Sequence, residues 1–199
     1  MLLGEKSLGN DVRAWAQFPF QAERLEGDPR FFLDSQGMSL ALNTAAQSFV
    51  SDSSVLESIV VRGVNGARRQ PVRTRVTVAG GLEGDRWAAG KAHPGDQLSM
   101  MNLDVASAFA NGQSIALFGD NLFTRLDLRE ASLGVGARLR IGSALVEVSA
   151  TPHVPCNRFK SRFGAAAFQA AALDVRLRGI YVTVLESGDI AIGDPVRVV

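Results

Sequence analysis

The fold class is decided by the stretch Arg138-Leu139-Arg140-Ile141-Gly142-Ser143-Ala144-Leu145-Val146-Glu147-Val148. Charged and apolar residues alternate in its first half, so Leu139 and Ile141 face one side of a strand and the two arginines face the other. Gly142-Ser143 is a two-residue turn signal, and strand-forming residues follow it. The stretch therefore predicts a β-hairpin with one buried and one solvated face.

The same kind of pattern extends over most of the chain. A short helix is expected after Asn102, a good N-cap residue, ending at Asn111-Gly112, and an alanine-rich helix over 164–174. Further strands are expected at 55–62, 72–78, 97–101, 179–186 and 190–198. Short, closely spaced strands with few helices favour a mainly β fold, a closed or nearly closed β-barrel with a few short peripheral helices.

The first quarter of the chain differs from the rest. Its apolar patches keep neither a helical nor an alternating period, and residues 48–54 form a Ser/Asp-rich connector. We therefore expect two parts: an N-terminal extension over 1–52, partly disordered, and a β-barrel domain over 53–199. Within the extension a helix is expected near 39–47, and Met38 is an alternative translation start.

Composition narrows the function classes. The 21 Lys and Arg residues nearly balance the 20 Asp and Glu residues, so the net charge of +1 gives no reason to expect a nucleic-acid or membrane partner. A single cysteine cannot form an internal disulfide, which favours a reducing compartment. No signal peptide and no apolar run of the ~18 residues that cross a bilayer is present, so we expect a soluble cytoplasmic protein.

The single cysteine, Cys156, lies just past the hairpin, between two prolines and three cations. In an extended segment, Cys156 and the three cations share one face, while Phe159 and Phe163 point into a core. The cations are Arg158, Lys160 and Arg162. The thiolate is the nucleophilic and metal-ligating form of cysteine, and adjacent cations stabilise it. A lone cysteine is also among the most commonly buried and inert residues, so both interpretations stand on residue type alone.

Five pieces of sequence point to a family. They are Gly-Leu-Glu-Gly-Asp at 81–85, Gly-Asp-Asn-Leu at 119–122, the glycine-flanked strand at 135–142, the proline-led Cys156, and residues 188–194. Their order resembles that of MOSC domains, the family named after the C-terminal part of molybdenum cofactor sulfurases. The resemblance covers roughly residues 55–199 and implies a MOSC-like β-barrel.

The resemblance also implies a chemistry. In some MOSC proteins the cysteine carries sulfur or ligates the molybdenum of a pterin cofactor, and several members reduce N-hydroxylated compounds. It therefore implies Cys156 as catalytic residue and metal ligand in a redox enzyme with a molybdenum cofactor, a small-molecule substrate and an electron-donor protein. Two alternatives remain: a sulfur carrier that passes persulfide sulfur from Cys156 to a partner, and a non-catalytic barrel that binds a small ligand. The oligomeric state is not set by the sequence.

Candidate cofactor-binding residues follow from residue type. Arg158, Lys160 and Arg162 suit the cofactor's phosphate. Asp85, Asp120 and the adjacent Asn121 stand next to turn glycines; they are candidates for positioning the cofactor, with capping of a turn as the alternative. Pyridoxal phosphate is not expected, because Lys160 is the only lysine near the proposed site and no aldimine-site motif surrounds it.

The two histidines are interpreted more conservatively. His153 and Cys156 have His-x-x-Cys spacing, but without a second pair they do not make a zinc site, so a structural role is expected for His153. Many stand-alone MOSC proteins have a His-Gly-Gly segment where this chain has His93-Pro94-Gly95. This departure puts a functional role of His93 in doubt and indicates a divergent branch with its substrate left open.

Overall fold

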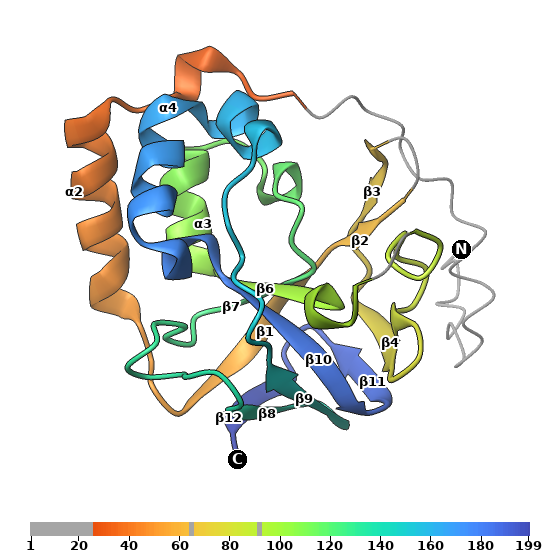
Figure 1. The fold of residues 1–199 in the computed structure, drawn as a ribbon. Helices are drawn as coiled ribbons and strands as arrows, with labels where there is room; N and C mark the ends of the chain where they lie inside the picture. Colours follow the sequence, from red (N-terminus) through yellow and green to blue (C-terminus); the bar gives the residue numbers. More distant parts are fainter. Residues whose placement is uncertain (1–25, 64–65, 91–92) are drawn as a thin grey trace, which may run out of the picture.

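The computed structural model describes residues 26–63, 66–90 and 93–199 (Figure 1). The first 25 residues of the predicted extension lie outside these ranges, and so does its apolar patch at 13–20.

The predicted β-barrel is confirmed: the described residues form a closed barrel, and it has seven strands. The strand order is β1-β12-β8-β9-β10-β6-β7, and β7 closes the ring by pairing with β1. The barrel is mixed, because β6 and β7 pair in parallel while the other neighbours are antiparallel. The bounds are β1 Ser53–Ile59, β6 Leu98–Asn102, β7 Leu122–Thr124, β8 Arg138–Ile141, β9 Ala144–Val148, β10 Ile180–Glu186 and β12 Pro195–Val198.

The predicted hairpin is β8–β9. Arg138 pairs in register with Glu147 and Ile141 with Ala144, and Leu139 and Ile141 are buried. The turn requires glycine at 142: its φ is +53°, and a Cβ there would lie 2.6 Å from the backbone oxygen of Asp189. The alternation read from the sequence thus follows the inside and outside of the barrel wall.

Two smaller sheets flank the barrel. One has the order β11 (Gly188–Ala191), β4 (Arg73–Thr77), β5 (Gly81–Leu82). The other, called the β2–β3 ribbon below, pairs β2 (Val61–Arg62) with β3 (Arg68–Arg69). The strands expected at 55–62 and 190–198 are therefore each divided, into β1 and β2 and into β11 and β12, and each piece pairs in a different sheet from its neighbour.

Three α-helices gather at one side of the barrel in Figure 1: α2 Ser35–Ala45, α3 Leu103–Ala110 and α4 Asn157–Leu173. Helix α3 has the predicted ends, since the Asn102 side chain accepts hydrogen bonds from the first turn and Asn111 is left-handed at φ 46°. Helix α2 falls inside the predicted extension and packs against α3 and α4, with Met38 only 2% exposed. Short 3₁₀ turns are η1 Pro29–Phe31, η2 Ala46–Ser48, η4 Pro94–Asp96, η5 Ile115–Leu117 and η6 Val175–Arg178.

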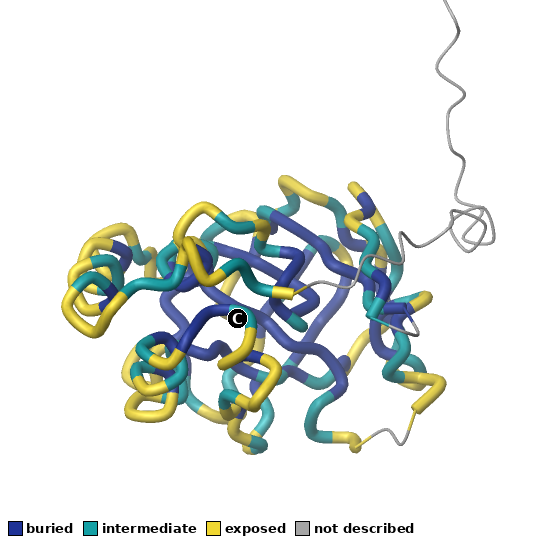
Figure 2. The backbone as a smooth tube through the Cα atoms, turned by 90° about the horizontal axis from the view of Figure 1, so that it is seen from above, coloured by how far each residue is buried: buried dark blue, intermediate teal, exposed yellow. Residues whose placement is uncertain are grey.

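The core has two parts, and Figure 2 shows the buried, dark blue segments gathered toward the middle of the molecule. Aliphatic residues of the strands fill the barrel, whereas the helices enclose an aromatic cluster. In that cluster Phe118 stacks on Phe163 at 4.1 Å between ring centroids, and Phe159 lies 5.0 Å from Phe163. The predicted burial of Phe159 and Phe163 is therefore confirmed.

The expected extended conformation beyond Cys156 is wrong. Cys156 itself is extended, but α4 begins at the next residue, so the alanine-rich helix starts seven residues earlier than expected. The helical path is interrupted at Gly164, whose φ of +89° is open to glycine and strained for other residues. Phe159 and Phe163 are one helical turn apart, which buries both on the same face just as a strand would.

Candidate functional site

A pocket of about 330 Å³ opens beside the first turn of α4. Cys156, His153 and Tyr181 contribute to its wall, and the floor includes Phe159 and Phe163 of the aromatic cluster. Six arginines complete it: Arg62, Arg68, Arg86, Arg158, Arg162 and Arg178. Among the described residues no aspartate or glutamate lines this pocket. An arginine-rich wall without carboxylates is suited to an anion.

Cys156 lies at the start of α4 with its side chain exposed. It occupies the N-cap position, but its side chain makes no capping hydrogen bond. The thiol is therefore accessible from the pocket and from solvent, which excludes the interpretation of Cys156 as a buried core residue.

The three cations after Cys156 separate. Arg158 and Arg162 line the pocket with Cys156, whereas Lys160 does not, and its Nζ lies 5.9 Å from the ring centroid of Phe168. The expected common face of all four residues is therefore wrong, because a helix places residues four apart together and turns the residue between them away. Burial lowers the pKa of Arg162, Arg158 lowers it further, and Cys156 opposes both.

Arg62, Arg68 and Arg86 reach the pocket from the β2–β3 ribbon and the loop beside it. Arg62 and Arg68 are register partners across the ribbon, and the Arg86 backbone N–H donates to the carbonyl of Arg62 at 2.7 Å. Burial lowers the pKa of Arg68 to about 10, and the charges of Arg162, Arg86 and Arg62 contribute. Sequence reasoning missed these three residues. Their only signal was arginine at each position, without a motif that connects them.

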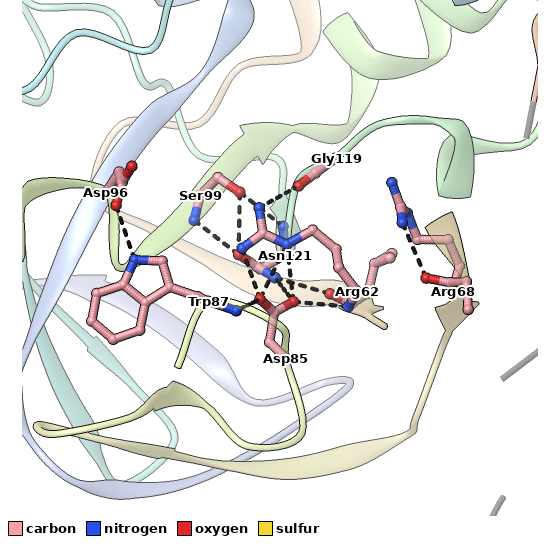
Figure 3. A network of polar contacts seen from close by, with 10 residues as sticks. Arg62, Arg68, Asp85, Trp87, Asp96, Ser99, Gly119 and Asn121 are labelled. Carbon is pink, nitrogen blue, oxygen red and sulfur yellow. Dashed lines mark hydrogen bonds and ion pairs between the residues drawn. The ribbon is translucent and has the colours of Figure 1, made fainter. Parts of the chain in front are cut away.

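Asp85 and Asn121 lie behind this wall (Figure 3). The Arg62 guanidinium donates to both Asp85 oxygens, at 2.8 and 2.9 Å, and also to the carbonyl of Gly119 at 3.0 Å. Asp85 further accepts from the backbone of Arg62 and Trp87 and from Nδ2 of Asn121. Burial alone would raise the pKa of Asp85, but the Arg62 contacts and backbone donors outweigh it and hold this pKa below its usual 3.8. Both residues fix the position of Arg62 and do not line the pocket.

Asp120 is fully buried next to two residues of the pocket wall. Arg178 donates through Nη1 to Asp120 Oδ2 at 2.5 Å, while Oδ1 lies 3.5 Å from Nδ1 of His153. Neither Oδ1 nor Nδ1 has a hydrogen-bond partner among the described residues. Burial, followed by the charge of Arg178, lowers the pKa of His153 to about 3, so its imidazole is neutral near pH 7. The ring packs on Tyr181 at 4.2 Å.

His93, the residue at the departure from the family pattern, lies elsewhere. Its Nδ1 accepts a hydrogen bond from the Gly95 backbone at 3.1 Å and caps η4, and its side chain is exposed. It does not line the arginine-rich pocket.

The family model described as "MOSC domain" matches residues 94–197, just over half of the chain. The chain belongs to the MOSC domain family. The match begins after the Gly81–Asp85 piece and includes β6 to β12, Asp120, Asn121 and Cys156. A search of curated proteins gave no significant match to this MOSC domain.

Solved structures share the fold of this MOSC domain. YuaD from Bacillus subtilis is 18% identical, covers 73% of this chain and 95% of its own, and has a TM-score of 0.57. YiiM from Escherichia coli is 24% identical, with 73% of this chain and 69% of its own covered and a TM-score of 0.53. At these identities the likeness extends to the fold alone. No helix in the described part of the MOSC domain is long and apolar enough to cross a membrane.

The donor atoms of the site limit what this MOSC domain can hold. The described residues contain no group of three or more His, Cys, Asp or Glu side chains placed to bind a metal ion. A bare metal ion in a protein needs about three or four such ligands. Cys156 therefore suits a metal that brings most of its ligands within an organic cofactor, and the arginines suit an anionic group of that cofactor.

Proposed function

We propose that this MOSC domain binds a molybdenum cofactor in the arginine-lined pocket, with Cys156 as the protein's ligand to the metal. The proposed activity is reduction of small molecules, N-hydroxylated compounds among them. The observation that carries the proposal is the exposed Cys156 thiol at a pocket lined by six arginines and no described carboxylate. A thiolate is a soft ligand suited to such a metal, and guanidinium groups bind a phosphate bidentately.

The chain's own residues would bind and orient the cofactor. Arg158 and Arg162 lie on the helix that begins after Cys156, so one ligand can contact the thiol and both guanidinium groups. Phe159 and Phe163 anchor that helix turn in the aromatic cluster, which keeps the arginines directed at the pocket. The cofactor, when bound, supplies the oxygen-atom chemistry. Reduction of an N-hydroxyl group to N–H consumes two electrons and two protons and releases water, so an electron-donor protein is part of the proposal.

A sulfur carrier is the second candidate, and the exposure of Cys156 favours it. The Cys156 thiolate would attack the outer sulfur of a donor persulfide, form its own persulfide, and release the donor cysteine as a thiolate. A non-catalytic barrel that binds a small anion is the third candidate.

The test is the molybdenum content of protein purified from a host that makes the cofactor. We expect stoichiometric molybdenum in the parent and loss of the metal in Cys156→Ser, which preserves side-chain size. Arg158→Ala is expected to lower the metal content, whereas Arg73→Ala, at an exposed arginine of β4 that is not part of the pocket lining, is not. Absence of molybdenum in the parent, or its retention in Cys156→Ser, contradicts the proposal. A mass increase of one sulfur that reductant removes, absent in Cys156→Ser, favours the carrier instead.

A further inference from the structure

Like charges face one another at two places around the pocket. Arg62 and Arg68 stand directly opposite each other across the β2–β3 ribbon, with Arg86 hydrogen-bonded to the same backbone. We call these three the ribbon arginines. Arg158 and Arg162, the helix arginines, are four apart on α4. Like charges in either arrangement destabilise the fold by a few tenths of a kcal/mol or more. Each arrangement therefore opposes folding except where another group compensates the charge.

The ribbon arginines are only partly compensated. Arg62 has an ion pair with Asp85, whereas Arg68 and Arg86 form no ion pair within the described residues, and the charge of Asp85 only partly offsets the arginines around them. The Nε of Arg68 is buried without a hydrogen-bond partner, and Figure 3 shows this side chain apart from the Asp85 network. Its guanidinium instead donates to the nearby carbonyls of Gly66 and Ala67. Buried donors without partners are costly, so their presence in a pocket wall indicates a ligand that accepts hydrogen bonds.

Arg178 supports the same conclusion from a third side of the pocket. It is only 6% exposed, it lines the pocket, and its Nε lacks a hydrogen-bond partner within the described part of the chain. Asp120 holds it in place through Nη1. The position of its guanidinium is therefore set by the fold before any ligand binds.

The two sets of arginines belong to different elements, and their combined positive charge exceeds the roughly −2 charge of one terminal phosphate. The helix arginines accompany Cys156 and are assigned to the cofactor's phosphate. We propose that the ribbon arginines bind a second anionic group, which belongs to the substrate: a small molecule that carries a phosphate, sulfonate or carboxylate. This inference rests on the proposed function. A neutral or cationic substrate would leave Nε of Arg68 buried without an acceptor and the half-buried Arg68 and Arg86 without an ion-pair partner among the described residues, which is unfavourable.

The experiment counts inorganic phosphate bound per chain by calorimetry, at low salt, on protein with and without cofactor. We expect two sites on the cofactor-free protein and one on the molybdenum-loaded protein. In both preparations we expect Arg68→Ala to weaken phosphate binding at the ribbon site by at least about tenfold, since a hydrogen bond to a charged group contributes that much or more to the affinity. Arg73→Ala on β4 serves as the matched control and should change neither site.

The outcomes separate this inference from the proposed function. Molybdenum-loaded protein that binds no phosphate, or whose site survives Arg68→Ala, overturns the inference while the function stands. If no preparation contains molybdenum, the function fails, and the cofactor-free protein decides: two sites with one lost in Arg68→Ala support the ribbon site, and one site or none overturns it. Thermal unfolding of Arg68→Ala checks that the variant is folded.

A second measurement compares substrates. Two N-hydroxylated compounds that differ by one carboxylate are offered to the loaded enzyme, and we expect the higher kcat/KM for the carboxylate form. Arg68→Ala should remove this preference mainly through KM, because the ribbon arginines bind the anionic group of the substrate and not its N-hydroxyl group. Equal kcat/KM values for the two compounds in the parent count against an anionic substrate.

Discussion

Asp85 and Asp120 look alike in sequence and differ in the structure. Each follows a glycine, each is buried, and each pairs with an arginine of the pocket wall. The two oxygens of Asp85 accept hydrogen bonds from Arg62, from two backbone N–H groups and from Asn121. Asp120 accepts from Arg178 through one oxygen, and its other oxygen has no partner among the described residues.

Asp85 is therefore a structural carboxylate, whereas Asp120 has an oxygen that can still accept a hydrogen bond. A saturated buried network is rigid and holds its members in one arrangement, which is how Asp85 fixes Arg62. An unsatisfied buried oxygen is rare in native proteins and is found where a site has a further task. Oδ1 of Asp120 lies beside Nδ1 of His153, which lines the pocket, so the oxygen without a partner is next to the pocket.

The largest expected effect comes from the isosteric replacement Asp85→Asn. An amide places an N–H group against donors and removes the charge opposite Arg62, so we expect a loss of about 3–5 kcal/mol in the free energy of unfolding. Asp120→Asn also removes a charge, opposite Arg178, but its carbonyl can still accept from Arg178 and its amide can donate to Nδ1 of His153, so we expect a smaller loss of about 1–3 kcal/mol. Urea denaturation measures both.

A surface ion pair provides the control for these two variants. Asp189 pairs with Arg75, and both side chains are substantially exposed. Asp189→Asn should therefore change the free energy of unfolding by about 1 kcal/mol or less. Equal losses in Asp85→Asn and Asp120→Asn would remove the contrast between the two carboxylates.

The second prediction concerns pH and His153. Its pKa lies at about 3 in the folded protein against 6.5 ordinarily, because burial and the nearby Arg178 and Arg62 outweigh the attraction of Asp120. The unfolded chain binds a proton at this histidine below pH 6.5, and the folded chain does not until about pH 3. The contribution of His153 to stability is therefore fully present above pH 6.5 and is lost as the pH falls from 6.5 toward 3. His153→Gln should flatten the profile by about 1 kcal/mol per pH unit.

Unfolding curves at several pH values give this slope. Tyr181→Phe keeps the ring that packs on His153 and removes only a hydroxyl whose raised pKa lies far above the window, so it should leave the slope unchanged. Suppose wild type and His153→Gln lose stability in parallel between pH 6.5 and 4. The imidazole then binds a proton in the folded protein and donates a hydrogen bond to the unused oxygen of Asp120.

Much of the fold was predictable because its signals are local. Alternation and a turn glycine define the β8–β9 hairpin within eleven residues, and Asn102 and Asn111 mark both ends of α3. The strand order of the barrel was not predictable in this way. The parallel pairing of β6 with β7, and the divided strands at 55–62 and 190–198, depend on contacts between segments distant in sequence.

The same distinction between local and long-range contacts applies to the residues of the site. Cys156 and its arginines are close in sequence, so their proximity could be predicted. Arg62, Arg68, Arg86 and Arg178 reach the pocket only through tertiary structure, since the ribbon, the loop after β5 and η6 line it together with α4. The saturation of Asp85 and the unused oxygen of Asp120 likewise depend on partners from other segments, and the two Gly-Asp pairs do not distinguish them.

The smallest expected effect tests why α4 was mistaken for an extended segment. A spacing of four is even, as in a strand, and also close to one helical turn, so Phe159 with Phe163 and Arg158 with Arg162 fit both structures. Only the residue between them distinguishes the two. Lys160 would join the pocket in a strand and leaves it in a helix, where it lies over Phe168. We expect Lys160→Ala to change stability by at most about 0.5 kcal/mol and to leave molybdenum content and phosphate binding unchanged, whereas Arg158→Ala lowers both. Loss of metal or phosphate in Lys160→Ala would mean that this lysine turns into the pocket when a ligand binds.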